Sequence, residues 1–180
     1  MARRTTAAAK RPEYKVTDNV LFEGARIIFR NFKGEETPYN RAGKRNFCVV
    51  IEDELFAERL AADGWNIKVL EPREEGDKPV HYIQVEVSYK FNPPKVYQLT
   101  ETTKTKLDEE SIENLDFADI KKVDLTIRPY NWVVNGKTGV KAYLKNMYVT
   151  INEDVLDKKY ANYGSDDIED DDVEEDELPF

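Results

Sequence analysis

The chain has 180 residues, of which 40% are hydrophobic and 35% are charged, so it can form one domain of ordinary size with its own core. One cysteine and one histidine exclude an internal disulfide and are too few for a histidine-based metal site or a catalytic triad. No apolar run approaches the length of a membrane span and no signal-peptide core is visible, so we expect a protein of the reducing cytoplasm without a membrane partner.

The formal net charge of -9 hides an uneven distribution. Residues 165–180 contain ten acidic and no basic residues, which leaves 26 acidic and 27 basic residues, a net charge of +1, for residues 1–164. A nearly neutral body can still gather its basic side chains on one face. The acidity of the whole chain therefore does not exclude binding to nucleic acid.

Residues 1–14 contain Arg3, Arg4, Lys10 and Arg11 and show no apolar periodicity. This composition predicts a flexible basic arm, which either contacts phosphates or has no specific task. We expect one folded domain at residues 15–160, followed by a disordered acidic tail at residues 161–180.

Short β-like runs fill the folded domain. Residues 33–44, rich in glycine, proline, asparagine and charge, read as a flexible loop, and residues 46–51 form a compact apolar strand. Cys48 in that strand is expected as a buried hydrophobic residue rather than a nucleophile. Alternation in residues 25–32 predicts an earlier strand with Ala25, Ile27 and Phe29 on one face and Arg26, Ile28, Arg30 and Phe32 on the other.

A short helix is predicted at residues 53–63, where Asp53 can cap the start and Gly64 can end it. Its expected apolar stripe is Leu55, Phe56 and Leu60. Further strands are predicted at residues 66–70, 82–89 and 96–100, with a turn or short helix in residues 108–120.

The last predicted element is a hairpin of residues 123–134 and 140–151. Its connection, residues 135–139, begins with an Asn-Gly pair that favours positive φ. Many short strands with one or two small helices indicate a mainly β fold with a closed or nearly closed barrel. A five-stranded oligonucleotide-binding (OB) barrel with added strands and loops fits this size.

The hairpin carries the best candidate site. Both of its outward faces alternate cations with aromatic rings, and pairing of the strands would place them together. Bases of unpaired nucleic acid stack on such rings while cations follow the phosphates, although each ring taken alone could instead pack under a loop. The outward residues are Arg128, Tyr130, Trp132, Lys141, Tyr143 and Lys145.

A second candidate patch lies on the first strand and the loop after it. In OB barrels the loop between the first two strands commonly grips the bound strand, although a plain solvated loop is an equal alternative for any one residue. Lys104 and Lys106, on a hairpin expected at the barrel edge, are further candidates. The patch comprises Arg26, Arg30, Phe32, Lys33, Tyr39, Arg41, Lys44 and Arg45.

Residues 165–180 cannot bury enough apolar surface to fold alone, so we expect them to be disordered. One interpretation is a tail that promotes solubility. The last residues favour another, because a free carboxylate beside a phenylalanine ring suits capture in a basic pocket with an apolar floor. This candidate partner-binding tip is Asp176, Glu177, Leu178, Pro179 and Phe180.

The tip resembles the C-terminus of bacterial and phage single-stranded DNA-binding proteins, with Glu177 and Leu178 as departures from the usual residues. The whole chain resembles the phage type, notably in residues 25–32, 45–51, 63–66 and 128–145. The resemblance implies a non-enzymatic OB-fold protein in the host cytoplasm that coats unpaired DNA during replication, recombination or repair. It also implies that the tip recruits a polymerase, a helicase or primase, or a recombinase.

Other readings stay open at this point. One is a metal-dependent nuclease, although outside the tail no carboxylate cluster accompanies a base or nucleophile. Another is a DNA-mimicking adaptor protein without affinity for DNA. A third keeps the binding site but changes the ligand to RNA or duplex DNA. We expect no cofactor and no structural metal.

Overall fold

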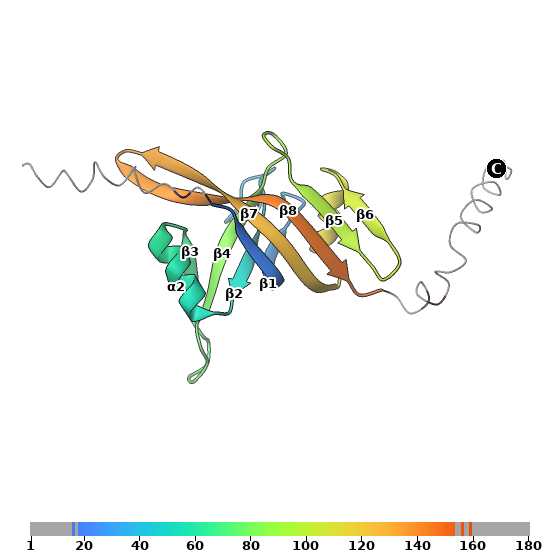
Figure 1. Ribbon diagram of the computed structural model, residues 1–180, viewed down its shortest axis with the longest axis horizontal. Helices are drawn as coiled ribbons and strands as arrows, with labels where there is room; N and C mark the ends of the chain where they lie inside the picture. Colours follow the sequence, from blue (N-terminus) through green and yellow to red (C-terminus); the bar gives the residue numbers. More distant parts are fainter. Residues whose placement is uncertain (1–15, 17, 154–155, 157–158, 160–180) are drawn as a thin grey trace, which may run out of the picture.

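The computed structural model describes residues 16, 18–153, 156 and 159 (Figure 1). The predicted basic arm at residues 1–14 and the acidic tail at residues 161–180 lie outside the described residues. The elements, in chain order, are β1 (Val20–Asn31), β2 (Arg45–Ile51), helix α2 (Glu54–Asp63), β3 (Ile67–Leu70), β4 (Val80–Val87), β5 (Lys95–Leu99), β6 (Lys104–Leu107), the 3-10 helix η2 (Ser111–Asp116), β7 (Ile120–Val134) and β8 (Lys137–Ile151).

The eight strands form one sheet in the order β3-β4-β2-β1-β7-β8-β5-β6, and an additional pairing joins β4 to β8. This pairing closes β1, β2, β4, β8 and β7 into a barrel. β1 is antiparallel to β7, whereas β4 and β8 are parallel. The predicted five-stranded OB-like barrel is confirmed. β3 extends it beyond β4, and the β5–β6 hairpin extends it along the second half of β8 (Figure 1).

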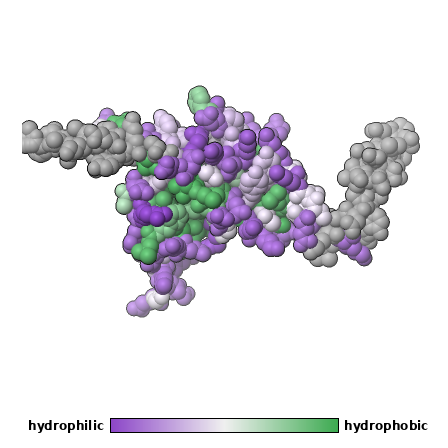
Figure 2. Space-filling view, in the orientation of Figure 1, coloured by the Kyte–Doolittle hydropathy of each residue, from purple (hydrophilic) through white to green (hydrophobic). Residues whose placement is uncertain are grey.

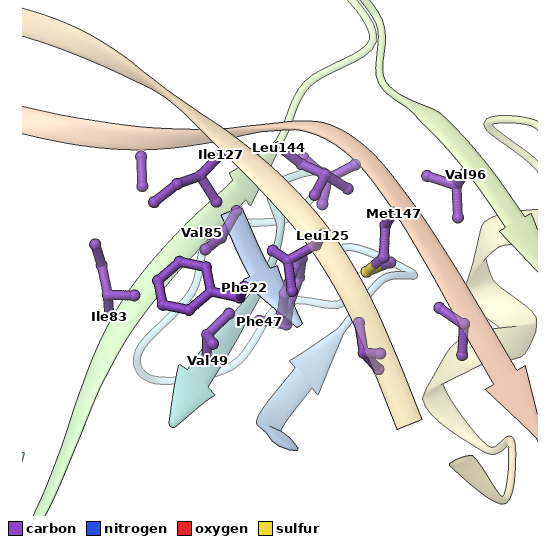
Figure 3. Packing of buried hydrophobic residues seen from close by; sticks show 14 of the residues in the cluster. Phe22, Phe47, Val49, Ile83, Val85, Val96, Leu125, Ile127, Leu144 and Met147 are labelled. Carbon is purple, nitrogen blue, oxygen red and sulfur yellow. The ribbon is translucent and has the colours of Figure 1, made fainter. Parts of the chain in front are cut away.

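Alternating side chains fill the barrel interior. Phe47 and Val49 of β2, Val85 of β4 and Leu125 of β7 point toward one another in Figure 3, and each is at most 1% exposed. A barrel of this size is filled by its own side chains, so a ligand must bind outside it. Cys48 is also buried, and burial raises the pKa of its thiol to about 11, which agrees with the predicted apolar role.

The prediction of faces on the first strand is wrong in part, because β1 contains two bulges. The register shifts between Phe22 and Ala25 and again between Ile28 and Asn31, with positive φ at Gly24 and Phe29. Each extra residue reverses the alternation of side chains that follows it. Phe29 is therefore 57% exposed.

The second bulge also turns Phe32 into the core, where it has no exposed surface and stacks on Phe47 with ring centroids 5.0 Å apart. The predicted nucleic-acid contact of Phe32 is therefore wrong, because its ring is sealed inside the barrel.

Turn and cap chemistry was predicted correctly. The Asp53 side chain accepts hydrogen bonds from the first turn of α2, and Gly64 ends the helix with a φ of 116°. Asn135 and Gly136 have positive φ as expected, but they form the whole connection, because β8 already starts at Lys137. Leu55 is not part of the apolar stripe of α2, since it is 76% exposed.

Hydrophilic residues cover most of the face in Figure 2, and hydrophobic residues gather over α2 and the strands beside it. No helix in the described part of the chain has the length and apolar character needed to cross a bilayer.

Candidate nucleic-acid interface

A groove of about 870 Å³ lies on the outside of the barrel. One side is formed by the loop between β1 and β2, and the other by the β7–β8 hairpin. β2 and β4 contribute to its floor together with the segment that follows α2. In an OB barrel these elements are the ones that bind oligonucleotides. The polar and aromatic residues that line the groove include Tyr39, Asn40, Arg41, Lys44, Asn46, Trp65, Gln84, Glu86, Trp132, Thr138 and Lys141.

Hydrogen bonds within the loop between β1 and β2 give this loop a defined shape. The Asn40 side-chain amide donates to the carbonyl of Lys44 at 2.9 Å and its oxygen accepts from Asn46 at 2.8 Å. The backbone of Gly43 donates to that of Gly34 at 2.7 Å. These bonds hold Tyr39, which is 98% exposed, beside the groove.

Trp132 is the largest partly exposed ring in the groove, and Gly139 determines its position. The two residues pair directly across the hairpin. A Cβ atom at Gly139 would lie 2.4 Å from Cζ2 of Trp132, so the indole occupies the space that any other residue would fill. The hairpin thereby presents a fixed aromatic surface to the groove.

A cluster of rings and cations continues from the groove along the outside of β7 and β8. The rings of Tyr130 and Tyr143 meet edge to face with centroids 5.8 Å apart. The Arg128 guanidinium lies 5.1 Å from the centroid of the Tyr143 ring, and the Lys141 ammonium lies 5.3 Å from it. The pairing of β7 with β8 therefore brings together the four residues as the sequence pattern predicted.

Glu86 lies among the groove cations and is not one of the predicted site residues. Its carboxylate is 2.6 Å from Nζ of Lys141 and 3.9 Å from Nζ of Lys44. Partial burial by itself lowers the pKa of Lys141, but the hydrogen bond and charge of Glu86 outweigh it, so the pKa is raised. Glu86 thus holds Lys141 at the groove in its charged form. Its outward position could have been predicted, because Gln84 and Glu86 alternate with the apolar residues Ile83 and Val85 in the sequence.

Other residues of the second predicted patch have structural partners outside the groove. Nη1 of Arg30 donates to the carbonyls of Leu115 and Ala118 at 2.8 and 2.9 Å, which holds η2 against the barrel. Arg45 is half-buried and pairs with Glu109 at 3.3 Å. These contacts explain the positions of Arg30 and Arg45 without a nucleic-acid ligand.

The remaining predicted residues lie on the surface but do not line the groove. Arg26 is exposed on β1 and lies 3.9 Å from Glu52. Lys33 starts the loop between β1 and β2, with its backbone held by Asp116, and Lys145 is exposed beside a bulge of β8. Of the second patch, the structure brings to the groove only Tyr39, Arg41 and Lys44.

Within the described part of the chain, no three histidine, cysteine, aspartate or glutamate side chains are grouped as metal ligands would be. What the barrel offers is an outer groove with rings, amides and lysines. This combination of fold and groove is typical of proteins that bind single-stranded nucleic acid.

Comparison with known protein families agrees with this class of protein. Residues 9–179 match the family described as the putative phage ssDNA-binding domain, and the chain belongs to this family. The resemblance of the whole chain to the phage type of single-stranded DNA-binding protein is confirmed. Because the family consists of DNA-binding proteins, the chain is a binding protein and not an enzyme.

Solved structures show the same fold at low sequence identity. The single-stranded DNA-binding protein of bacteriophage Enc34, in a C-terminally truncated form, aligns with a TM-score of 0.51 and 12% identity, covering 76% of this chain and 87% of that chain. The same phage protein in complex with ssDNA gives a TM-score of 0.51 and 12% identity over 76% and 88% of the two chains. No curated protein matches the chain significantly.

Proposed function

We propose that this protein binds unpaired DNA in the groove between the β1–β2 loop and the β7–β8 hairpin, and that it coats and protects this DNA during phage replication and recombination. The observation that carries the proposal is the placement of Trp132 and Tyr39 beside Arg41, Lys44 and Lys141 in one groove. The Enc34 protein, which shares the fold, has been solved in complex with ssDNA.

In this proposal, bases stack on Trp132 and on the rings of Tyr130 and Tyr143, each of which contributes about 1–3 kcal/mol. The groove cations contact phosphates, so affinity falls as the salt concentration rises. Stacking reads no base edges, and binding is therefore largely independent of sequence. Duplex DNA hides the faces of its bases and binds more weakly.

The experiment is a titration of full-length protein with fluorescent single- and double-stranded oligonucleotides across a salt series, for wild type and Trp132→Leu. We expect preferential binding of single strands, quenching of tryptophan fluorescence, and a loss of about fivefold or more in affinity for Trp132→Leu. Leu70→Ala, an exposed position of β3 outside the groove, is the control. Unchanged affinity in Trp132→Leu would overturn the groove assignment.

The same titration separates the rival functions. A DNA-mimicking adaptor would show no affinity for any oligonucleotide. A nuclease would shorten the strand when divalent metal is added. Tighter binding of a matched RNA would change the ligand and leave the groove in place.

We also propose three functional parts: a basic arm at residues 1–14, the binding domain at residues 15–160 and an acidic tail at residues 161–180. The tail would recruit replication or recombination proteins through residues 176–180, where acids precede Leu178, Pro179 and Phe180. Phe180→Ala is expected to abolish capture of a purified phage or host replication protein while leaving affinity for DNA unchanged. Equal capture by both proteins would disprove this role.

A further inference from the structure

A second surface of rings and cations lies away from the groove, on the β5–β6 hairpin and the adjoining half of β8. The rings of Tyr97 and Tyr148 are nearly parallel, with an interplanar angle of 16° and centroids 5.0 Å apart. Nζ of Lys104 lies 4.6 Å from the centroid of Tyr97 and 5.6 Å from that of Tyr148. We call Tyr97, Tyr148, Lys104 and Lys106 the Tyr97 platform.

Strand pairing fixes the direction in which the platform faces. Tyr97 pairs with Tyr148 where β5 runs parallel to β8, and the preceding pair, Val96 and Met147, is completely buried. Successive residues of a strand point to opposite faces. The two tyrosines therefore lie on the outer face of the sheet, where Tyr148 is 37% exposed. Lys106 pairs with Tyr97 on the same face.

The platform cations differ from those of the groove, because no carboxylate in the described part of the chain lies within ion-pair distance of Lys104 or Lys106. The acid nearest in register is Asp124, opposite Tyr148. Its carboxylate accepts a hydrogen bond from the Gly24 backbone at 2.7 Å and lies 3.9 Å from Lys122. Within the described part of the chain, no acidic side chain therefore offsets the two platform lysines.

A purely structural role explains only part of this arrangement. A lysine over a ring stabilises a hairpin modestly, and so does a pair of stacked tyrosines. Neither effect requires both rings to stay at the surface, or two lysines to lie without an acidic partner among the described residues. A lysine stem is long enough to move its ammonium from a ring to a phosphate, which frees the ring for a base.

β8 connects the platform to the candidate interface. Tyr143 and Tyr148 both point outward from β8, and five residues of strand span about 17 Å. Between them lies the bulge that follows Leu144, where Lys145 is exposed. A strand of DNA that leaves the groove past Tyr143 can follow this edge to the platform.

We infer that the Tyr97 platform is a second subsite for single-stranded DNA, in which bases stack on Tyr97 and Tyr148 and phosphates contact Lys104 and Lys106. The inference rests on the proposed function of the groove and extends it. Only strands long enough to pass from the groove along β8 occupy both subsites.

Strand length provides the test. OB folds engage about 4–16 nucleotides, so full-length protein is titrated with oligo(dT) of about 5 and about 20 nucleotides. In Tyr97→Leu/Tyr148→Leu, the affinity for the long strand is expected to fall about tenfold while the affinity for the short strand stays unchanged. Tyr97→Phe/Tyr148→Phe keeps the rings and should retain long-strand affinity. Equal affinities of the leucine variant and wild type for the long strand would overturn the inference.

If the leucine variant does not fold, Lys104→Gln/Lys106→Gln is tested instead. Both lysines are exposed, so their replacement should not disturb folding. It should weaken binding of the long strand and make its salt dependence shallower, and no change in either quantity would count against the subsite. Trp132→Leu separates this inference from the proposed function. Trp132→Leu should weaken binding of both the short and the long strand. If only the platform variants weakened binding, the groove assignment would be wrong, whereas the platform assignment would stand.

Discussion

At the scale of single residues, the absence of one methyl group sets the geometry of the groove. Gly139 leaves room for the Trp132 indole, and any Cβ there would lie 2.4 Å from the ring. We predict that Gly139→Ala displaces the indole and weakens binding of single-stranded DNA about as much as Trp132→Leu does, although the tryptophan is retained. Affinity and tryptophan quenching on binding are measured by titration.

The control is Val133→Ala, an exposed position next to Trp132 on the other face of the hairpin. It should leave both affinity and quenching unchanged. If Gly139→Ala binds and quenches like wild type, the position of the indole over Gly139 does not matter for binding.

Substitution of Glu86 is predicted to raise the affinity for DNA, whereas Gly139→Ala is predicted to lower it. Its carboxylate holds Lys141 at 2.6 Å and Lys44 at 3.9 Å, so these lysines are partly neutralised before DNA arrives. Glu86→Gln removes that negative charge and should tighten binding of single-stranded DNA about threefold to tenfold at low salt, with a steeper salt dependence.

The matched control for this change is Glu52→Gln, which releases Arg26 on the surface outside the groove. It should change affinity little. Weaker binding by Glu86→Gln would mean that the carboxylate positions the lysines productively instead of competing with phosphate.

At the scale of elements, two arginines of β1 that look equivalent in sequence have different roles. Arg30 donates to two carbonyls around η2, whereas Arg26 is exposed and forms a long ion pair with Glu52. Arg30→Met should lower the free energy of unfolding by about 2 kcal/mol, because two partly buried carbonyls lose a charged donor. Arg26→Met should cost less than about 1 kcal/mol.

Urea unfolding measures these stabilities, and an oligonucleotide titration of the same samples shows whether Arg30 also binds DNA. The structural role predicts unchanged affinity for Arg30→Met under conditions where the variant is folded. A large loss of affinity with normal stability would restore the role that the sequence pattern first suggested.

Elements governed by local chemistry were predictable from the sequence. The caps of α2 at Asp53 and Gly64 and the Asn135-Gly136 turn depend on neighbouring residues alone. Register along the closing hairpin then follows from alternation, which is why Arg128 and Tyr143 were correctly placed together.

Bulges were not predictable in the same way, because they depend on pairing with distant strands. The second bulge of β1 reversed the faces assigned to Phe29 and Phe32. The groove position of Glu86 likewise requires that β4 pair with β8, a contact between segments far apart in the chain. Local patterns therefore predicted which rings gather on the hairpin but not which acid lies among the lysines.

At the scale of the whole molecule, charge is separated along the chain. Residues 165–180 carry ten acidic residues, while residues 1–164 have a net charge of +1. A tethered acidic segment has a high effective concentration near the cations of its own domain. It can therefore compete with DNA phosphates for those cations.

We predict that removing residues 165–180 tightens binding of single-stranded DNA, most clearly at low salt, where charges are poorly screened. The measurement compares full-length and truncated protein with one oligonucleotide from low to physiological salt. A variant in which the ten acids become asparagine or glutamine keeps the length of the segment and isolates its charge. If that variant behaves like the truncation, competition is electrostatic, because chain length is unchanged. If truncation leaves affinity the same at every salt concentration, the segment does not compete with DNA.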